Sequence, residues 1–105
     1  MISNRIVVKA KITLKTTEKG GRNTGIKSGY RPNHAFEKTE DIKFLRTYIG
    51  EIEFDNKEII EPGEMSIVTV RFLNIPEIEK YIKIGQKWYI YEIPKLVAEG
   101  EIIEI

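Results

Sequence analysis

Cysteine is absent from this chain of 105 residues, and histidine and tryptophan each occur once. The lack of cysteine excludes disulfides, thiolate catalysis and cysteine-based metal sites. The single histidine, His34, cannot by itself build a histidine-based zinc site, so we expect no bound metal. No apolar run approaches the roughly 18 residues of a membrane span, and the N-terminus lacks the apolar core of a secretory signal. These absences predict a cytoplasmic protein with no membrane partner.

The composition is that of a globular protein, because 41% of the residues are hydrophobic, 31% are charged and the net charge is only +1. We expect one domain that spans residues 1–105. Residues 1–34 hold eight basic side chains and one acidic (net +7), whereas residues 35–105 hold nine basic and fifteen acidic (net −6). Either the basic end meets an anionic partner, or the acidic part folds against it and the charges intermix on the surface.

Alternating hydrophobicity predicts several β-strands. Residues 5–16 alternate strictly, with five apolar side chains on one face of the expected strand: Ile6, Val8, Ala10, Ile12 and Leu14. Further strands are expected at residues 33–36, 47–54, 65–73, 87–93 and 96–105. Pro62 and Gly63 are typical of the central positions of a type II turn, and residues 76–82 fit either a helical turn or an irregular connection. Five to seven such strands predict an all-β barrel or sandwich.

Residues 20–36 contain four glycines, two arginines, a lysine and a proline, which together rule out a helix. We expect a long, basic, ordered loop that is anchored by Ile26, Tyr30 and Phe36. Arginine side chains and backbone amides in such a loop can hold phosphate oxygens. The candidate contacts to a partner, within and beside the loop, are Lys19, Arg22, Lys27, Tyr30 and Arg31.

The same arginines can instead brace the loop by donating hydrogen bonds to backbone carbonyls. We expect this bracing role for Arg31, and for Arg22 at the loop tip we leave both roles open. His34 is expected to be a hydrogen-bonded structural residue rather than a general base, and Trp88 is expected to fill the core. The glycine spacing does not match a phosphate-binding loop, so we expect no bound nucleotide. We identify no catalytic residues.

Several short motifs follow one another in the order found in a known family. The letters GGRNT at 20–24 and GYRP at 29–32, followed by Phe36, resemble the segment GGRHTP…GYRPQFYF of the C-terminal domain (domain 3) of bacterial elongation factor Tu. The spacing matches without a gap from residue 20 to residue 36. Weaker similarities continue along the chain at 62–64, 88–92 and 98–100, with an insertion between residues 36 and 47.

The resemblance implies a small, closed, six-stranded antiparallel barrel of Greek-key type, with residues 20–36 crossing its outer surface. In the family, this domain touches the T-stem of aminoacyl-tRNA and packs on the GTPase domain. Arg22 matches the family's motif arginine on the tRNA-facing loop, and Thr24 belongs to the same motif. Asn23 replaces the family's histidine and Asn33 its glutamine, both at positions tied to that surface. Asn23, Thr24 and Asn33 therefore join the candidate contacts.

These 105 residues contain no phosphate loop and no magnesium site, so we expect a free-standing, non-enzymatic module without a cofactor. The first hypothesis is that the basic loop recognises structured RNA such as tRNA, or a translation-associated protein. The alternative is a protein-interaction mimic or an immunity-type protein that occupies the docking surface of a translation factor or a toxin. An enzyme would instead need a deep pocket with two or more convergent polar side chains.

Overall fold

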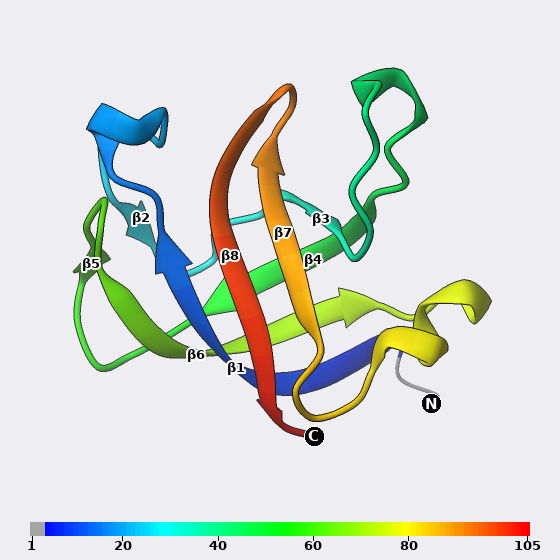
Figure 1. Ribbon diagram of the computed structural model, residues 1–105. Coiled ribbons are helices and arrows are strands. Elements are labelled where there is room, and N and C mark those ends of the chain that lie inside the picture. The colour runs from blue at the N-terminus through cyan, green and yellow to red at the C-terminus, as the bar shows by residue number, and fades with distance from the viewer. Residues whose placement is uncertain (1–3) are drawn as a thin grey trace.

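The computed structural model describes residues 4–105, in which six strands close into an antiparallel barrel (Figure 1). Hydrogen bonds join the strands around the barrel in the order β1, β6, β4, β3, β7, β8, and β8 pairs again with β1. The bounds of these strands are β1 (Arg5–Leu14), β3 (Asn33–Ala35), β4 (Tyr48–Glu53), β6 (Met65–Leu73), β7 (Lys87–Glu92) and β8 (Lys95–Glu104). The all-β, closed six-stranded barrel that we predicted is confirmed.

The connections between these strands hold a second, two-stranded sheet and three 3-10 helices. β2 (Ile26–Lys27) pairs with β5 (Ile59–Ile60) beside the barrel. The helices are η1 (Thr17–Lys19), η2 (Ile42–Phe44) and η3 (Pro76–Tyr81). The structure thus assigns residues 76–82 mainly to a helix that begins at a proline. None of the helices within residues 4–105 is long and apolar enough to cross a membrane.

β1 shows how the alternating pattern builds the barrel wall. Four alternate side chains point into the barrel and are at most 3% exposed: Val8, Ala10, Ile12 and Leu14. β1 pairs with β6 from Arg5 opposite Leu73 to Thr13 opposite Met65, and it pairs with β8 along its other edge. A slip by one residue would turn the whole apolar set outward, so the sequence pattern specifies this register.

β6 begins directly after the predicted turn at Pro62 and Gly63. The N–H of Glu64 donates to the carbonyl of Glu61 at 3.0 Å, and Gly63 has a φ of +89°. A positive φ at the third position is the feature that makes glycine favourable in a type II turn. The turn prediction is confirmed, and the bounds of β6 are those expected from its β-branched sequence.

A buried polar pair, His34 and Trp88, lies in the core of the barrel. Both side chains are 0% exposed, and Trp88 Nε1 donates to His34 Nδ1 at 3.0 Å. Because Nδ1 accepts, the ring proton lies on Nε2, which donates to the Gly50 carbonyl at 3.1 Å. Burial lowers the pKa of His34 to about 4, so the ring is neutral at neutral pH. The structural role that we expected for His34 and the core position of Trp88 are confirmed.

The basic N-terminal part of the chain meets carboxylates from later strands. Three ion pairs join the two parts: Lys11 with Glu101 at 3.8 Å, Arg31 with Glu51 at 3.5 Å, and Arg22 with Glu92. At these positions the charges intermix, as the second interpretation of the charge asymmetry predicted. Exposed pairs of this kind contribute only about 0–1 kcal/mol to stability. Their main effect is to reduce the positive field around the basic segment.

Candidate binding loop

We refer to residues 20–32, which lead from η1 to β3, as the binding loop. Its first residues are fixed against the end of β1 and the start of β8. The N–H of Gly21 donates to the Thr16 carbonyl at 2.9 Å, and Lys95 Nζ donates to the Gly21 carbonyl at 3.1 Å. A Cβ at position 21 would lie 2.4 Å from the Lys15 carbonyl oxygen, so only glycine fits this close approach. The loop therefore begins in one defined conformation.

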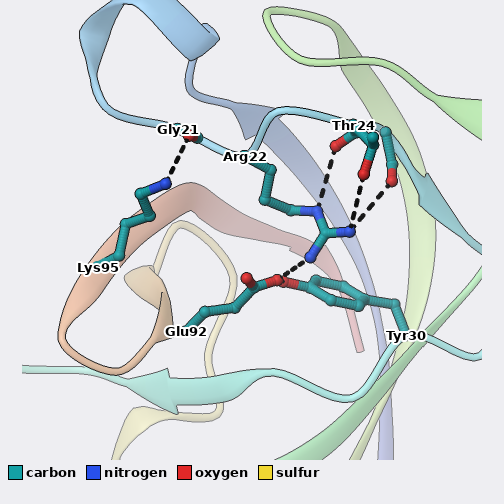
Figure 2. Close-up of polar contacts among 7 residues, drawn as sticks. Gly21, Arg22, Thr24, Tyr30, Glu92 and Lys95 are labelled. Atoms are coloured by element: carbon teal, nitrogen blue, oxygen red, sulfur yellow. Dashed lines mark hydrogen bonds and ion pairs between the residues drawn. The ribbon is translucent and has the colours of Figure 1, made fainter.

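Arg22 lies at the centre of the hydrogen bonds that hold the loop together (Figure 2). Its Nε donates to the Thr24 carbonyl at 3.2 Å, and a terminal nitrogen reaches the Thr24 hydroxyl at 3.3 Å and the Gly25 carbonyl at 3.4 Å. The other terminal nitrogen bonds the Glu92 carboxylate on β7, which also accepts from the Tyr30 hydroxyl. The guanidinium carbon lies 5.2 Å from the centre of the Tyr30 ring. Arg22 thus braces the loop, which is one of the two roles left open for it.

Arg22, Tyr30 and Glu92 form a cluster in which the charges of Arg22 and Glu92 stabilise each other. Burial acts to lower the pKa of Arg22, but the hydrogen bond and charge of Glu92 outweigh it, and the pKa lies above its usual value. Burial, followed by the hydrogen bond to Glu92, raises the pKa of the Tyr30 hydroxyl. Tyr30 therefore stays protonated as the donor to Glu92 at any physiological pH. The cluster ties the loop to the barrel wall through one carboxylate.

The second half of the loop is attached to the neighbouring sheet and to β4. Ile26 is 2% exposed and pairs with the fully buried Ile60 in the β2–β5 sheet. The N–H of Gly29 donates to the Ile52 carbonyl at 2.8 Å, and the N–H of Ile52 donates to the Tyr30 carbonyl at 2.9 Å. These bonds confirm that the segment is ordered, with Ile26 and Tyr30 among its anchors. They also show that its end, from residue 33, forms part of the barrel wall rather than crossing outside it.

The predicted bracing role of Arg31 is wrong. Its side chain is 68% exposed, and its printed contact is a 3.5 Å approach to Glu51 rather than a bond to a backbone carbonyl. The reason is the extended backbone, in which successive side chains point to opposite sides. Pro32 and the half-buried Tyr30 face the barrel, so Arg31 and Asn33 face solvent.

The outer face of the loop and the residues directly before and after it carry most of the candidate contacts. Six of them belong to exposed residues: Lys19, Asn23, Thr24, Lys27, Arg31 and Asn33. Within the described residues, the ammonium groups of Lys19 and Lys27 have neither an ion pair nor a hydrogen bond. An open hollow of about 410 Å³ lies beside Lys27, with Arg22 and Tyr30 also in its lining. The arrangement can receive an anionic group, and Arg22 and Tyr30 shape the surface rather than project from it.

Two residues that complete this site were missed at the level of sequence. Glu92 is 70 residues from Arg22 in the chain and Lys95 is 74 residues from Gly21. No local pattern links either pair, and only the barrel topology, which brings the β7–β8 hairpin under the loop, would have suggested them (Figure 2). No group of three or more histidine, aspartate or glutamate side chains in residues 4–105 is placed to hold a metal ion.

The fold and the loop can now be compared with known families. Residues 2–105 match the family described as the elongation factor Tu C-terminal domain. The chain belongs to this family. The match covers essentially the whole chain and confirms the resemblance first seen in residues 20–36. An elongation factor Tu C-terminal domain is a non-catalytic domain of a translation factor, so the family supports a role among translation components.

Proposed function

We propose that this domain is a non-enzymatic, cytoplasmic binding module that recognises structured RNA of the tRNA type through the outer face of the binding loop. The observation that carries the proposal is that the ammonium groups of Lys27 in the loop and Lys19 beside it have no partner among residues 4–105, while hydrogen bonds hold the loop in place. Lysine and arginine contacts to phosphates supply most of the affinity of such complexes. A pre-ordered loop also loses less conformational entropy on binding.

The remaining candidates have complementary roles in this proposal. Asn23, Thr24 and Asn33 are exposed and offer hydrogen-bonding groups to sugar or phosphate oxygens, and Arg31 adds a partly neutralised charge. Arg22 is only 25% exposed and already bonds Glu92, so it acts by shaping the loop. RNA contact is therefore assigned to the two lysines and the polar residues around them.

A salt titration of tRNA binding tests this function. For the wild-type protein we expect the logarithm of the association constant to fall with the logarithm of salt concentration, by about 0.7–0.9 for each phosphate contacted. Lys27→Ala or Lys19→Ala should each remove about one such unit of slope. Lys83→Ala changes an exposed lysine outside the loop and should leave the slope unchanged. The RNA proposal fails if wild type shows no salt-sensitive tRNA binding at micromolar concentration.

A protein partner at the same loop is the second candidate, either a translation-associated protein or, for a mimic or immunity-type protein, a translation factor or toxin. It is favoured by Glu51 and Glu92, which neutralise Arg31 and Arg22 and leave the loop with little excess positive charge. In that case, a complex isolated on the immobilised domain would contain protein alone and would survive nuclease treatment. A complex that nuclease releases would instead support the RNA proposal.

A further inference from the structure

A second hollow, of about 340 Å³, lies between η3 and the segment that connects β3 to β4. We call it the aromatic pocket. Phe36 and Tyr81 stack in parallel in its floor, with ring centres 4.6 Å apart and planes 4° apart, and Tyr48 meets Phe36 edge-on at 5.5 Å. Phe44 of η2 lines the wall and is 74% exposed, the highest value among the large hydrophobic side chains of residues 4–105.

The carboxylates in the pocket lining already have partners. Arg46 Nε and a terminal nitrogen lie 3.2 and 2.5 Å from one oxygen of Glu77. Glu37 accepts a hydrogen bond from the Tyr81 hydroxyl, and this bond raises the pKa of Tyr81 to about 12. Neither carboxylate is therefore left without a donor.

The two lysines at the rim of the pocket, unlike these carboxylates, have no hydrogen-bonding partner among the described residues. Lys38 and Lys80 line the pocket, and in the described part of the chain their ammonium groups have no ion pair or hydrogen bond. They lie only near aromatic rings, 4.5 Å from the centre of Tyr89 and 5.1 Å from the centre of Tyr81. An apolar floor is thus combined with two ammonium groups that can donate hydrogen bonds to carboxylates.

We infer that the aromatic pocket is a docking site for an acidic segment of a partner protein. The segment would insert one apolar side chain against Phe44 and Tyr81 and place a carboxylate beside Lys38 and Lys80. Exposed aromatic residues are typical anchors of protein interfaces. The β3–β4 connection and η1 project on opposite sides of the barrel, so the pocket lies apart from the start of the binding loop (Figure 1).

The floor of the aromatic pocket is poorly suited to stacking a nucleobase. Single-stranded nucleic acids bind by stacking bases on free aromatic faces. Phe36 is 5% exposed and its ring is covered by Tyr81, so the floor offers no free face for a base. A protein segment can instead place an apolar side chain against Phe44 and its own carboxylates beside Lys38 and Lys80.

Selection from a displayed library of random 12-residue peptides tests this inference. Peptides are selected on the wild-type protein and counter-selected on Phe44→Ala, and the enriched sequences are then synthesised and titrated. We expect enriched peptides that share an apolar residue flanked by acidic residues. Phe44→Ala should weaken their binding at least tenfold, and the charge reversal Lys38→Glu with Lys80→Glu should do the same.

Matched controls separate this result from misfolding and from the loop. Met65→Ala removes another exposed hydrophobic side chain, 55% exposed on the outside of β6, and should not change peptide affinity. Lys27→Ala should weaken tRNA binding but not peptide binding, while Phe44→Ala should do the reverse. The inference is overturned if no enriched peptide depends on Phe44, or if the enriched peptides are basic. It is equally overturned if single-stranded RNA competes for the pocket, or if sedimentation shows a dimer that Phe44→Ala dissociates.

Discussion

His34 makes the stability of the barrel sensitive to pH. In the folded protein its pKa is about 4, because burial disfavours the charged ring, whereas an unfolded chain has an ordinary histidine pKa of about 6.5. Between these values only the unfolded state binds the proton, so stability falls as the pH is lowered from about 6.5 toward 4. Between pH 7.5 and 5.5 we expect a loss of about 1 kcal/mol in the free energy of unfolding measured with urea.

The control for this prediction is His34→Gln, whose amide can accept from Trp88 and donate to Gly50. Because the chain holds one histidine, the variant removes every imidazole from the titration. Its free energy of unfolding should change little between pH 7.5 and 5.5, even if the variant is less stable at both. An equal loss in wild type and variant would show that His34 is not the source.

At the level of single residues, the sequence predicted the strand positions His34 and Trp88 better than the arginines of the glycine-rich segment. Trp88 was expected to fill the core and His34 to be a hydrogen-bonded structural residue, and the structure confirms both. For the two arginines, the sequence left the role of Arg22 open and predicted a bracing role for Arg31 that the structure contradicts. The glycine-rich segment has no hydrophobic period that would set which side chains face inward, so neither Arg22 as the brace nor Arg31 in solvent could be derived.

At the level of the element, we expect the order of the binding loop to depend on Arg22. Arg22→Ala removes bonds to Thr24, Gly25 and Glu92, and charged hydrogen bonds contribute more than neutral ones. We expect a loss of about 1 kcal/mol in the free energy of unfolding, because the site is partly exposed. The larger effect should be local, as faster hydrogen exchange of the loop amide at Gly29.

Arg31→Ala is the matched control for this experiment, since it removes the same side chain from the same loop. Arg31 is 68% exposed and makes only a long contact with Glu51, so we expect hydrogen exchange at Gly29 to remain as in wild type. If the two variants change exchange equally, or if Arg22→Ala loosens the barrel strands as much as the loop, Arg22 does not brace the loop.

The longer elements could be predicted from the sequence, and the shortest could not. β1, β6 and β8 carry enough alternating residues to define both strand and face, and their bounds agree within two residues. β5 and η2 were not identified. A two-residue strand such as β5 exists only because β2 lies beside it, and η2 is a single turn capped by Asp41, whose carboxylate accepts from the N–H of Lys43 at 2.9 Å.

For the whole molecule, closure of the barrel fixes the positions of the binding loop and the aromatic pocket on the same domain. β1 and β8 are the first and last strands, and their pairing completes the wall. β7 and β8 also supply Glu92 and Lys95 to the binding loop, while β3 and β4 flank the aromatic pocket. The family resemblance predicted this closed wall and the strand pattern alone left a barrel or a sandwich open, whereas the side-chain contacts across the wall required the three-dimensional arrangement.

Neighbouring isoleucines on β8 give a direct test of closure. Ile102 is 0% exposed and opposite Ala10 of β1, whereas Ile103 is 39% exposed on the outside. Ile102→Ala should lower the free energy of unfolding by about 3 kcal/mol, since it removes buried methylene groups and leaves a cavity in a closed core. Ile103→Ala should lower it by less than about 1 kcal/mol.

Urea unfolding, followed by both tryptophan fluorescence and circular dichroism, measures the two values. Because Trp88 lies inside the same barrel, the two signals should change together in each variant. If Ile103→Ala is the more destabilising change, β8 is shifted by one residue and the register of the closed barrel is wrong.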